Sequence, residues 1–161
     1  MTALRIVPAS ESDIPLILSF IHKIAEYEKL SHQVTATEET LRASLFGPRP
    51  AAEVLLAYWE EKPAGYAVFF HNFSTFLGRA GIYLEDLFVE PELRGKGIGK
   101  ALLSAIAKEA QKRDCGRLEW AVLDWNKPSI DFYLSLGAKP MDEWTIFRMT
   151  EDSIAKLARG S

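Results

Sequence analysis

The segment from Arg94 to Lys100, Arg-Gly-Lys-Gly-Ile-Gly-Lys, constrains the fold more than any other part of this chain. It follows a strand-like run, Gly81–Val89, and precedes a helix-like run, Ala101–Arg113. A glycine-rich turn between a strand and a helix can direct backbone N–H groups at one point, and the positive end of the helix favours an anion there. Arg94, Lys96 and Lys100 add positive charge. The segment therefore predicts a binding site for a phosphorylated ligand.

Two well-known nucleotide-binding patterns do not fit this segment. In a P-loop, Arg94 would have to be glycine and Ala101 would have to carry a hydroxyl for Mg²⁺. In the dinucleotide fingerprint a third glycine follows the second by three residues, but Gly97 and Gly99 are two apart and Lys100 stands in that place. The alternative is a helix entry that merely uses glycine. That alternative is disfavoured because three glycines interleaved with three cations are costly to order without a ligand.

Strand-like and helix-like runs alternate along the chain. Strands are predicted at residues 4–7, 52–59, 64–70, 81–89, 117–123 and 144–149, with a loop at residues 72–79. Helices are predicted from Ser10 to about Leu30, from a Thr35–Glu38 capping box to Phe46, over residues 101–113, from Pro128 to before Gly137, and over residues 151–158. An antiparallel meander with a strand–helix–strand crossover indicates an α/β fold. We expect one domain, residues 1–161, with a mixed, central, twisted sheet flanked by helices.

The first predicted helix carries a carboxylate on its apolar stripe. That stripe consists of Ile14, Ile17, Leu18, Ile21 and Ala25. Glu28 lies seven residues after Ile21 and therefore continues the same stripe. We expect the Glu28 side chain to face the interior or a cleft.

Composition excludes several functional classes. A net charge of −3 and a pI near 5.7 argue against a general nucleic-acid binder. The sequence lacks an N-terminal signal-peptide pattern and an apolar run long enough to span a membrane, which predicts a soluble, cytoplasmic protein without a membrane partner. Cys115 is the single cysteine, so an internal disulfide is excluded and a reducing compartment is the simplest reading. His22, His32 and His71 lack metal-ligand spacing, so no metal is expected.

Three further segments carry a family resemblance. They are Ala25–Glu28, Tyr83–Val89 and Leu123–Tyr133, the last with the pattern Trp-Asn-x-Pro-Ser-Ile-x-Phe-Tyr. With the glycine-rich segment they resemble the GNAT superfamily of N-acetyltransferases, and within it the diamine (spermidine/spermine) and thialysine acetyltransferase branch. The resemblance covers nearly the whole chain. It implies acetyl-CoA as co-substrate, a small cationic amine as acceptor, either a polyamine or a lysine-like amine such as thialysine, direct attack in a ternary complex, and a homodimer.

The resemblance also implies which residues contact the coenzyme. They are Leu87, Phe88 and Val89 on the strand, Arg94, Gly95, Lys96, Gly97, Ile98, Gly99 and Lys100 in the loop, and Asn126, Ser129 and Tyr133 further on. The strands at 85–89 and 117–123 should splay apart to admit the pantetheine arm. For Asn126 the alternative role is a cap of the helix that follows it.

Two residues are candidates for proton transfer. The family's catalytic tyrosine falls on Tyr133, which would protonate the departing thiolate; from periodicity alone, an ordinary core tyrosine is favoured. Glu85 is the candidate base, directly or through water, and amine binding without proton transfer is the equal alternative. On an alternating strand Glu85 shares a face with Tyr83 and Leu87, while Asp86 faces the other way. One of the two acids must then point into a covered layer, although a β-bulge would change the assignment.

The amine pocket is expected to combine carboxylates with aromatic faces, which together attract an extended cation. The residues implied are Tyr27, Glu28, Glu85, Trp120, and Asp142 or Glu143. Cys115 is expected to be structural, because the sequence places no partner for a cysteine nucleophile. Two alternatives stay open: an acetyltransferase for another small amine or amino acid, and a non-catalytic acyl-CoA-binding sensor, against which Tyr133 and Glu85 argue.

Overall fold

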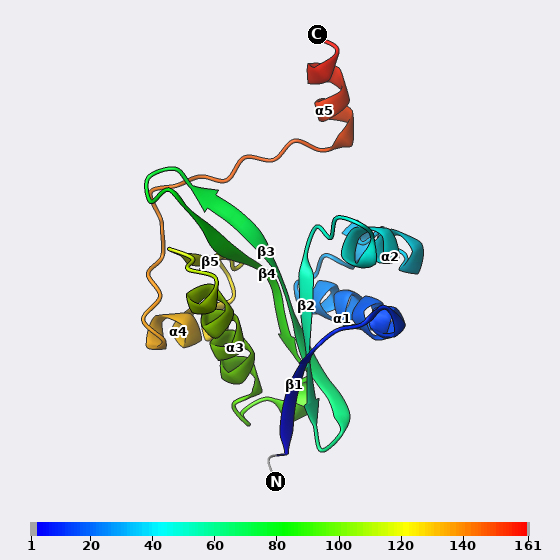
Figure 1. The fold of residues 1–161 in the computed structure, drawn as a ribbon, viewed down its shortest axis with the longest axis vertical. Coiled ribbons are helices and arrows are strands. Elements are labelled where there is room, and N and C mark those ends of the chain that lie inside the picture. The colour runs from blue at the N-terminus through cyan, green and yellow to red at the C-terminus, as the bar shows by residue number, and fades with distance from the viewer. Residues whose placement is uncertain (1–2, 161) are drawn as a thin grey trace. The chain divides into compact units, whose positions relative to one another are not determined.

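The computed structural model describes residues 3–160, and their contacts group the chain into two units, residues 1–123 and 124–161. The first unit holds a five-stranded sheet in the order β1-β2-β3-β4-β5 (Figure 1). Its strands are β1 Leu4–Pro8, β2 Glu53–Trp59, β3 Lys62–Ser74, β4 Arg79–Val89 and β5 Leu118–Trp120. The first four pair antiparallel in sequence order, and β5 pairs parallel with β4. The predicted mixed sheet is therefore confirmed, whereas the single domain stays a prediction.

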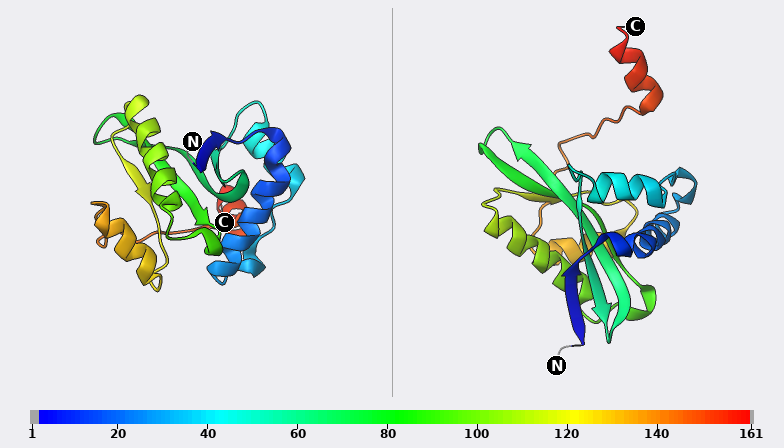
Figure 2. Two further views of the ribbon diagram at one scale, coloured as in Figure 1. Left: turned by 90° about the horizontal axis from the view of Figure 1, so that it is seen from below. Right: turned by 45° about the vertical axis from the view of Figure 1, so that its right-hand side comes forward.

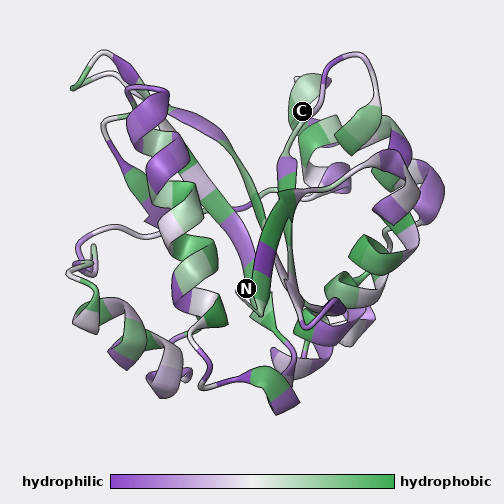
Figure 3. Ribbon diagram, turned by 60° about the horizontal axis from the view of Figure 1, so that its bottom comes forward, coloured by the Kyte–Doolittle hydropathy of each residue, from purple (hydrophilic) through white to green (hydrophobic). Residues whose placement is uncertain are grey.

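Helices cover both faces of this sheet (Figures 1 and 2). Helices α1, Ile14–Tyr27, and α2, Glu38–Phe46, lie on one face, and α3, Ile98–Lys112, lies on the other. Hydrophobic residues recur along these helices and the strands between them (Figure 3). On the α1 face, the Phe20 ring centroid lies 5.2 Å from that of Tyr66 in β3 and 5.9 Å from that of Phe88 in β4. These rings form the centre of the core under α1.

The helix starts differ from those predicted. Helix α1 begins at Ile14, after a 3-10 turn at Glu11–Asp13, and ends at Tyr27 rather than Leu30. The predicted Thr35–Glu38 capping box is wrong. Thr37 caps α2 instead, because its hydroxyl accepts from Thr40 N at 3.1 Å while Thr40 Oγ1 accepts from Thr37 N at 2.9 Å. Two further 3-10 turns lie at Ser31–Gln33 and Pro91–Leu93.

Half of the predicted loop at residues 72–79 is strand. Strand β3 continues to Ser74, and β4 starts at Arg79 directly opposite it. Asn72 pairs with Gly81 in this ladder, although asparagine and glycine are poor strand residues. Pairing with β4 overrides that local preference and makes a long hairpin with a tip at residues 75–78.

A β-bulge in β4 decides which side chains reach the α1 face. Val68 pairs with Asp86, but the next residue of β3, Phe69, pairs with Leu84, so Glu85 is the extra residue. Because β3 keeps alternating through this point, Asp86 lies on the α1 face. Leu84 lies on the opposite face with Phe69.

The bulge overturns the predicted faces of β4. Tyr83 shares the α1 face with Asp86, and its ring centroid lies 5.2 Å from that of Phe70. Leu87 lies on the other face, opposite Ala67. The prediction that Leu87 shares the Tyr83 face, and that Asp86 does not, is wrong because it assumed unbroken alternation. Asp86 is half-buried and Glu85 exposed, so Asp86 is the acid that points into the covered layer.

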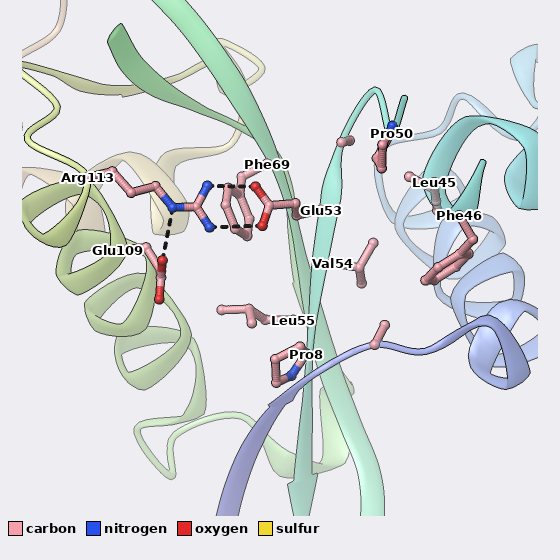
Figure 4. A pocket seen from close by; sticks show the side chains of 12 residues that line it. Pro8, Leu45, Phe46, Pro50, Glu53, Val54, Leu55, Phe69, Glu109 and Arg113 are labelled. Carbon is pink, nitrogen blue, oxygen red and sulfur yellow. Dashed lines mark hydrogen bonds and ion pairs between the residues drawn. The ribbon is translucent and has the colours of Figure 1, made fainter. Parts of the chain in front are cut away.

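An ionic network ties the end of α3 to the sheet (Figure 4). We call Glu53, Glu109 and Arg113 the Arg113 network. The Arg113 guanidinium donates to both Glu53 carboxylate oxygens, at 2.6 and 2.9 Å, and to Glu109 Oε2 at 3.0 Å. Its Cζ lies 5.6 Å from the Phe69 ring centroid. These contacts satisfy every charge in the network.

The second unit contains two helices, α4 Lys127–Ser135 and α5 Glu151–Ala158, as predicted. Helix α4 ends before Gly137, whose φ of 92° is a conformation that favours glycine. The strand predicted at residues 144–149 does not form, and the side chains of Trp144 and Phe147 are 74% and 91% exposed. Alternation alone cannot make a strand, because a strand also needs a partner edge.

Candidate active site

The glycine-rich loop between β4 and α3 forms an open cradle. Gly95 and Gly97 both adopt φ of 82°, and a Cβ added to either would meet nothing within 4 Å. The first helical hydrogen bond runs from Ala101 N to Gly97 O at 3.0 Å, so the N–H groups of residues 98–100 have no acceptor inside the helix. The Ile98 side chain is buried, so only its backbone can face a ligand. The loop thus has the form that an anion at a helix start requires.

The cations of this loop do not all behave alike. Lys100 is exposed at the start of α3, and Lys96 Nζ lies 5.4 Å from the Trp59 ring centroid. Arg94, predicted to add charge for the phosphates, instead donates from Nε to Val89 O at 3.0 Å. Its guanidinium lies 5.1 Å from the Tyr27 ring centroid. The contact with Tyr27 could not be read from sequence.

The edge of β4 beside this loop lacks a β5 neighbour. The parallel pairs between β4 and β5 are Ile82↔Leu118, Tyr83↔Glu119 and Leu84↔Trp120, and the ladder stops there. It stops where the bulge begins, so the described β5 forms no ladder pairs with residues 85–89 of β4. The ladder thus ends where the resemblance predicted a splay, and the contact of an extended arm with β4 stays a prediction.

Three carboxylates, Glu28, Glu85 and Asp86, form what we call the acidic cluster. Glu28 is the C-cap of α1, and the other two lie at the bulge of β4. Burial raises the pKa of Glu28, and the nearby charges of Asp86 and then Glu85 raise it further. Burial also raises the pKa of Asp86. The cluster therefore holds like charges together at a partly covered place.

Tyr66 orients one member of the acidic cluster. Its buried hydroxyl donates to Asp86 Oδ2 at 2.6 Å, which partly offsets the effect of burial on the pKa of Asp86. Burial and the charge of Asp86 raise the pKa of the Tyr66 phenol well above its ordinary value. Tyr66 was missed in the sequence, because only the strand register shows that it reaches Asp86.

Aromatic residues lie along the same strands. Burial, followed by the charges of Glu85 and Glu119, raises the pKa of Tyr83. Trp120 is half-buried and pairs with Leu84, one residue before Glu85. Tyr27 is exposed and lies against Arg94. The structure therefore places Glu28 and Trp120 near the bulge that contains Glu85, and Tyr27 directly before Glu28.

The remaining predicted residues belong to the second unit. Asn126 is buried, and its Oδ1 accepts from Ser129 N at 3.4 Å, which is the alternative role of helix cap. Tyr133 is half-buried in α4, and its ring centroid lies 5.5 Å from that of Phe132. Asp142 and Glu143 are exposed after α4. Their predicted roles stay predictions.

Two other features of residues 3–160 bear on ligands. No group of three or more His, Cys, Asp or Glu side chains in this range is placed to hold a metal ion. No helix in the same range is long and apolar enough to cross a bilayer. Cys115 is half-buried, and its Sγ donates weakly to Arg113 O at 4.0 Å.

Residues 21–138, more than half of the chain, match the Acetyltransferase (GNAT) family. The chain belongs to this family. It is 42% identical to the thialysine N-epsilon-acetyltransferase of Bos taurus over 98% of this chain and 99% of that protein. It is 33% identical to the L-ornithine N5-acetyltransferase of Arabidopsis thaliana over 95% and 87% of the two chains. An integron cassette protein from the mobile metagenome of V. cholerae has a matching fold, with a TM-score of 0.82, 27% identity and 99% of both chains covered.

This GNAT protein is an N-acetyltransferase, and GNAT acetyltransferases use acetyl-CoA as co-substrate. The loop fits that co-substrate. Gly95 and Gly97 leave the cradle open, and the N–H groups at the start of α3 have no acceptor inside the helix and are suited to bind a pyrophosphate.

Proposed function

We propose that this N-acetyltransferase transfers the acetyl group of acetyl-CoA to a primary amine of a small cationic substrate. A lysine-like diamine such as thialysine is the first choice, and a polyamine is the second. The observation that carries the proposal is the acidic cluster, where the Tyr66 hydroxyl donates to Asp86 Oδ2 at 2.6 Å. Burial raises the pKa of Glu28, and Asp86 and Glu85 lie close enough for their charges to raise it further. An ammonium ion would relieve that repulsion. The identity to thialysine and ornithine acetyltransferases supports the same class of acceptor.

The acceptor must lose a proton before it attacks. An alkylammonium has a pKa of about 10.4, so offering the neutral amine near pH 7.4 costs about 4 kcal/mol. Glu85 takes that proton, directly or through a water, because the bulge leaves it exposed at the end of the β4–β5 ladder. Glu28 and Asp86 hold the remaining positive charge of the substrate. Tyr27, Trp120, and Asp142 or Glu143 complete the pocket.

Acetyl transfer then proceeds by direct attack. The neutral amine attacks the thioester carbonyl, a backbone N–H of β4 residues 85–89 stabilises the oxyanion, and the C–S bond breaks. Tyr133 gives its phenolic proton to the departing thiolate, and the resulting phenolate regains a proton from the nitrogen that becomes the amide. Asn126 and Ser129 contribute to the coenzyme site, together with the backbone of Leu87, Phe88 and Val89. Loop residues 95–100 contribute beside them, and Arg94 adds only its positive charge to that site.

A homodimer in the cytoplasm is part of the proposal. The support is the second unit, where Trp144, Ile146 and Phe147 are each more than 70% exposed and α5 exposes Ile154 and Leu157. Exposed apolar surface of this kind marks an interface. Phe147→Asp should convert a dimer to a monomer in light scattering, and a mass that is unaltered would remove this segment from the interface. We propose no metal or nucleic-acid partner.

The deciding experiment is a thiol-release assay with acetyl-CoA and a panel of thialysine, lysine, ornithine, spermidine, spermine, putrescine and a peptide. Turnover led by thialysine or ornithine supports the first choice. Turnover led by spermidine or spermine supports the second. Turnover of the peptide alone would refute a small-amine acceptor.

Tyr133→Phe tests the acid. We expect kcat to fall about 100-fold, the usual scale for general acid catalysis, with little change in coenzyme affinity. Phe132→Leu on the same helix is the matched control for packing. Unchanged turnover in Tyr133→Phe would refute the assignment.

A further inference from the structure

Arg94 makes three contacts that join separate parts of the first unit. Its Nε donates to Val89 O at 3.0 Å, its Cζ lies 5.1 Å from the Tyr27 ring centroid, and the same Cζ lies 5.7 Å from the Phe88 ring centroid. Tyr27 is the last residue of α1, and Phe88 is in β4. One guanidinium therefore ties the start of the glycine-rich loop to the end of α1.

These contacts use the properties that distinguish arginine from lysine. A planar guanidinium can lie over aromatic faces while its N–H groups donate sideways, and a lysine ammonium cannot do both. If Arg94 served chiefly to attract phosphates, charge alone would suffice. Its hydrogen bond to a backbone carbonyl and its two ring contacts point to a fixed geometry instead.

We propose that Arg94 is a positioning residue for the amine pocket, a role that rests on the proposed function. It holds Tyr27, and through it the neighbouring Glu28, against the coenzyme loop. Arg94 directly precedes Gly95 in the coenzyme loop. Its side chain therefore connects the coenzyme site to the amine site. Coenzyme that orders the loop therefore also tightens the amine pocket, and by linkage amine tightens coenzyme.

Arg94→Lys is the test, since it keeps the charge and removes the planar contacts. We expect the KM for the best amine of the panel to rise about tenfold, which corresponds to about 1.4 kcal/mol. The Kd of CoA measured without amine should stay as in the wild type. Arg42→Lys, on an exposed arginine paired with Glu11, is the matched control and should alter neither constant.

A double-mutant cycle guards against a variant that merely folds poorly. Tyr27→Leu removes the ring that Arg94 contacts, so Arg94→Lys should add little to the amine KM in that background. Independent, multiplying effects would overturn the proposal. So would an Arg94→Lys variant with weakened CoA binding and an unaltered amine KM, because that result makes Arg94 a phosphate ligand. Failure of the proposed function would appear differently, as absent turnover of small amines by the wild-type enzyme.

Discussion

The first unit holds two groups of carboxylates, and the structure shifts the pKa values of the two groups in opposite directions. In the Arg113 network, Glu53 accepts two hydrogen bonds from one guanidinium, and this lowers its pKa. In the acidic cluster, Glu28 and Asp86 lie near one another in partial burial, and the pKa of each is raised. Satisfied charges stabilise a fold, whereas like charges held together reduce stability and mark a functional site. The contrast separates a structural network from the proposed amine site within one sheet.

The largest expected difference is in activity. Glu28→Gln should raise the amine KM about 10- to 100-fold, because a hydrogen bond to a charged group contributes about 1.5–3 kcal/mol. Glu53→Gln makes the same chemical change in the Arg113 network and should leave the amine KM unaltered. Steady-state kinetics on both variants checks this. Equal effects would abolish the distinction between the two groups.

For the stability of the fold we expect the reverse: changes in the Arg113 network should matter more than changes in the acidic cluster. Arg113→Met leaves Glu53 and Glu109 without their shared cation and should reduce the free energy of unfolding by about 1–2 kcal/mol, since the network is only partly buried. Asp86→Asn keeps an acceptor for the Tyr66 hydroxyl but removes a repulsive charge. It should leave stability unaltered or raise it by about 1 kcal/mol. Urea unfolding near pH 7 measures both, and a clear loss in Asp86→Asn contradicts the repulsion.

The pH dependence of stability should differ in sign between the two groups. The folded pKa of Glu53 lies below its ordinary value of 4.5, so its contribution is present above that value and is lost as pH falls through the folded pKa. The folded pKa values of Glu28 and Asp86 are raised, so their contribution is present at low pH and is lost as pH rises through the folded values.

Thermal unfolding from pH 3 to 8 separates these two terms. Glu53→Gln should flatten the loss of stability in acid. Asp86→Asn should flatten a loss that begins above the ordinary Asp value of 3.8 and continues toward neutral pH. A variant that flattens the opposite limb would contradict the direction assigned to its pKa.

The smallest expected effect comes from the residue that orients the cluster. Tyr66→Phe removes the hydrogen bond that lowers the pKa of Asp86, so that pKa should rise and the amine KM near pH 7 should increase a few-fold, or about 1 kcal/mol. Raising the pH should restore the amine KM, which loss of packing would not do. Tyr58→Phe is the control, because Arg5 contacts its ring face, which remains.

The sequence predicted the parts of this molecule that local patterns decide. The glycine spacing from Gly95 to Gly99 located the cradle, and helical periodicity placed Glu28 at the partly covered end of α1. The sequence could not predict which side chains of β4 lie on which face of the sheet, because the single extra residue, Glu85, is defined only by pairing with β3. The role of Asp86 and its contact with Tyr66 follow from that register.

Pairing also explains the other differences. Residues 72–74 are strand because β4 lies opposite them, and residues 144–149 are not strand, although their pattern is the more strand-like. The contacts of Arg94 likewise could not be predicted from a local pattern. Its place in a glycine-rich motif indicates charge, but its ring contacts depend on where α1 ends in space.

The bulge at Glu85 has a consequence for how such an enzyme can evolve. Residue 85 stands outside the register of β3 with β4, so a change of its side chain leaves the paired positions and the packing beneath α3 as they are. Its neighbours on either side, Leu84 and Asp86, face different layers. Since Glu85 is the proposed contact with the amine, a substitution at this one position would change the proposed site while the paired strands stay as they are. Deleting Glu85 would close the bulge: Leu84 and Asp86 would become consecutive residues opposite Phe69 and Val68, both would keep their faces, and only the side chain of Glu85 would be lost.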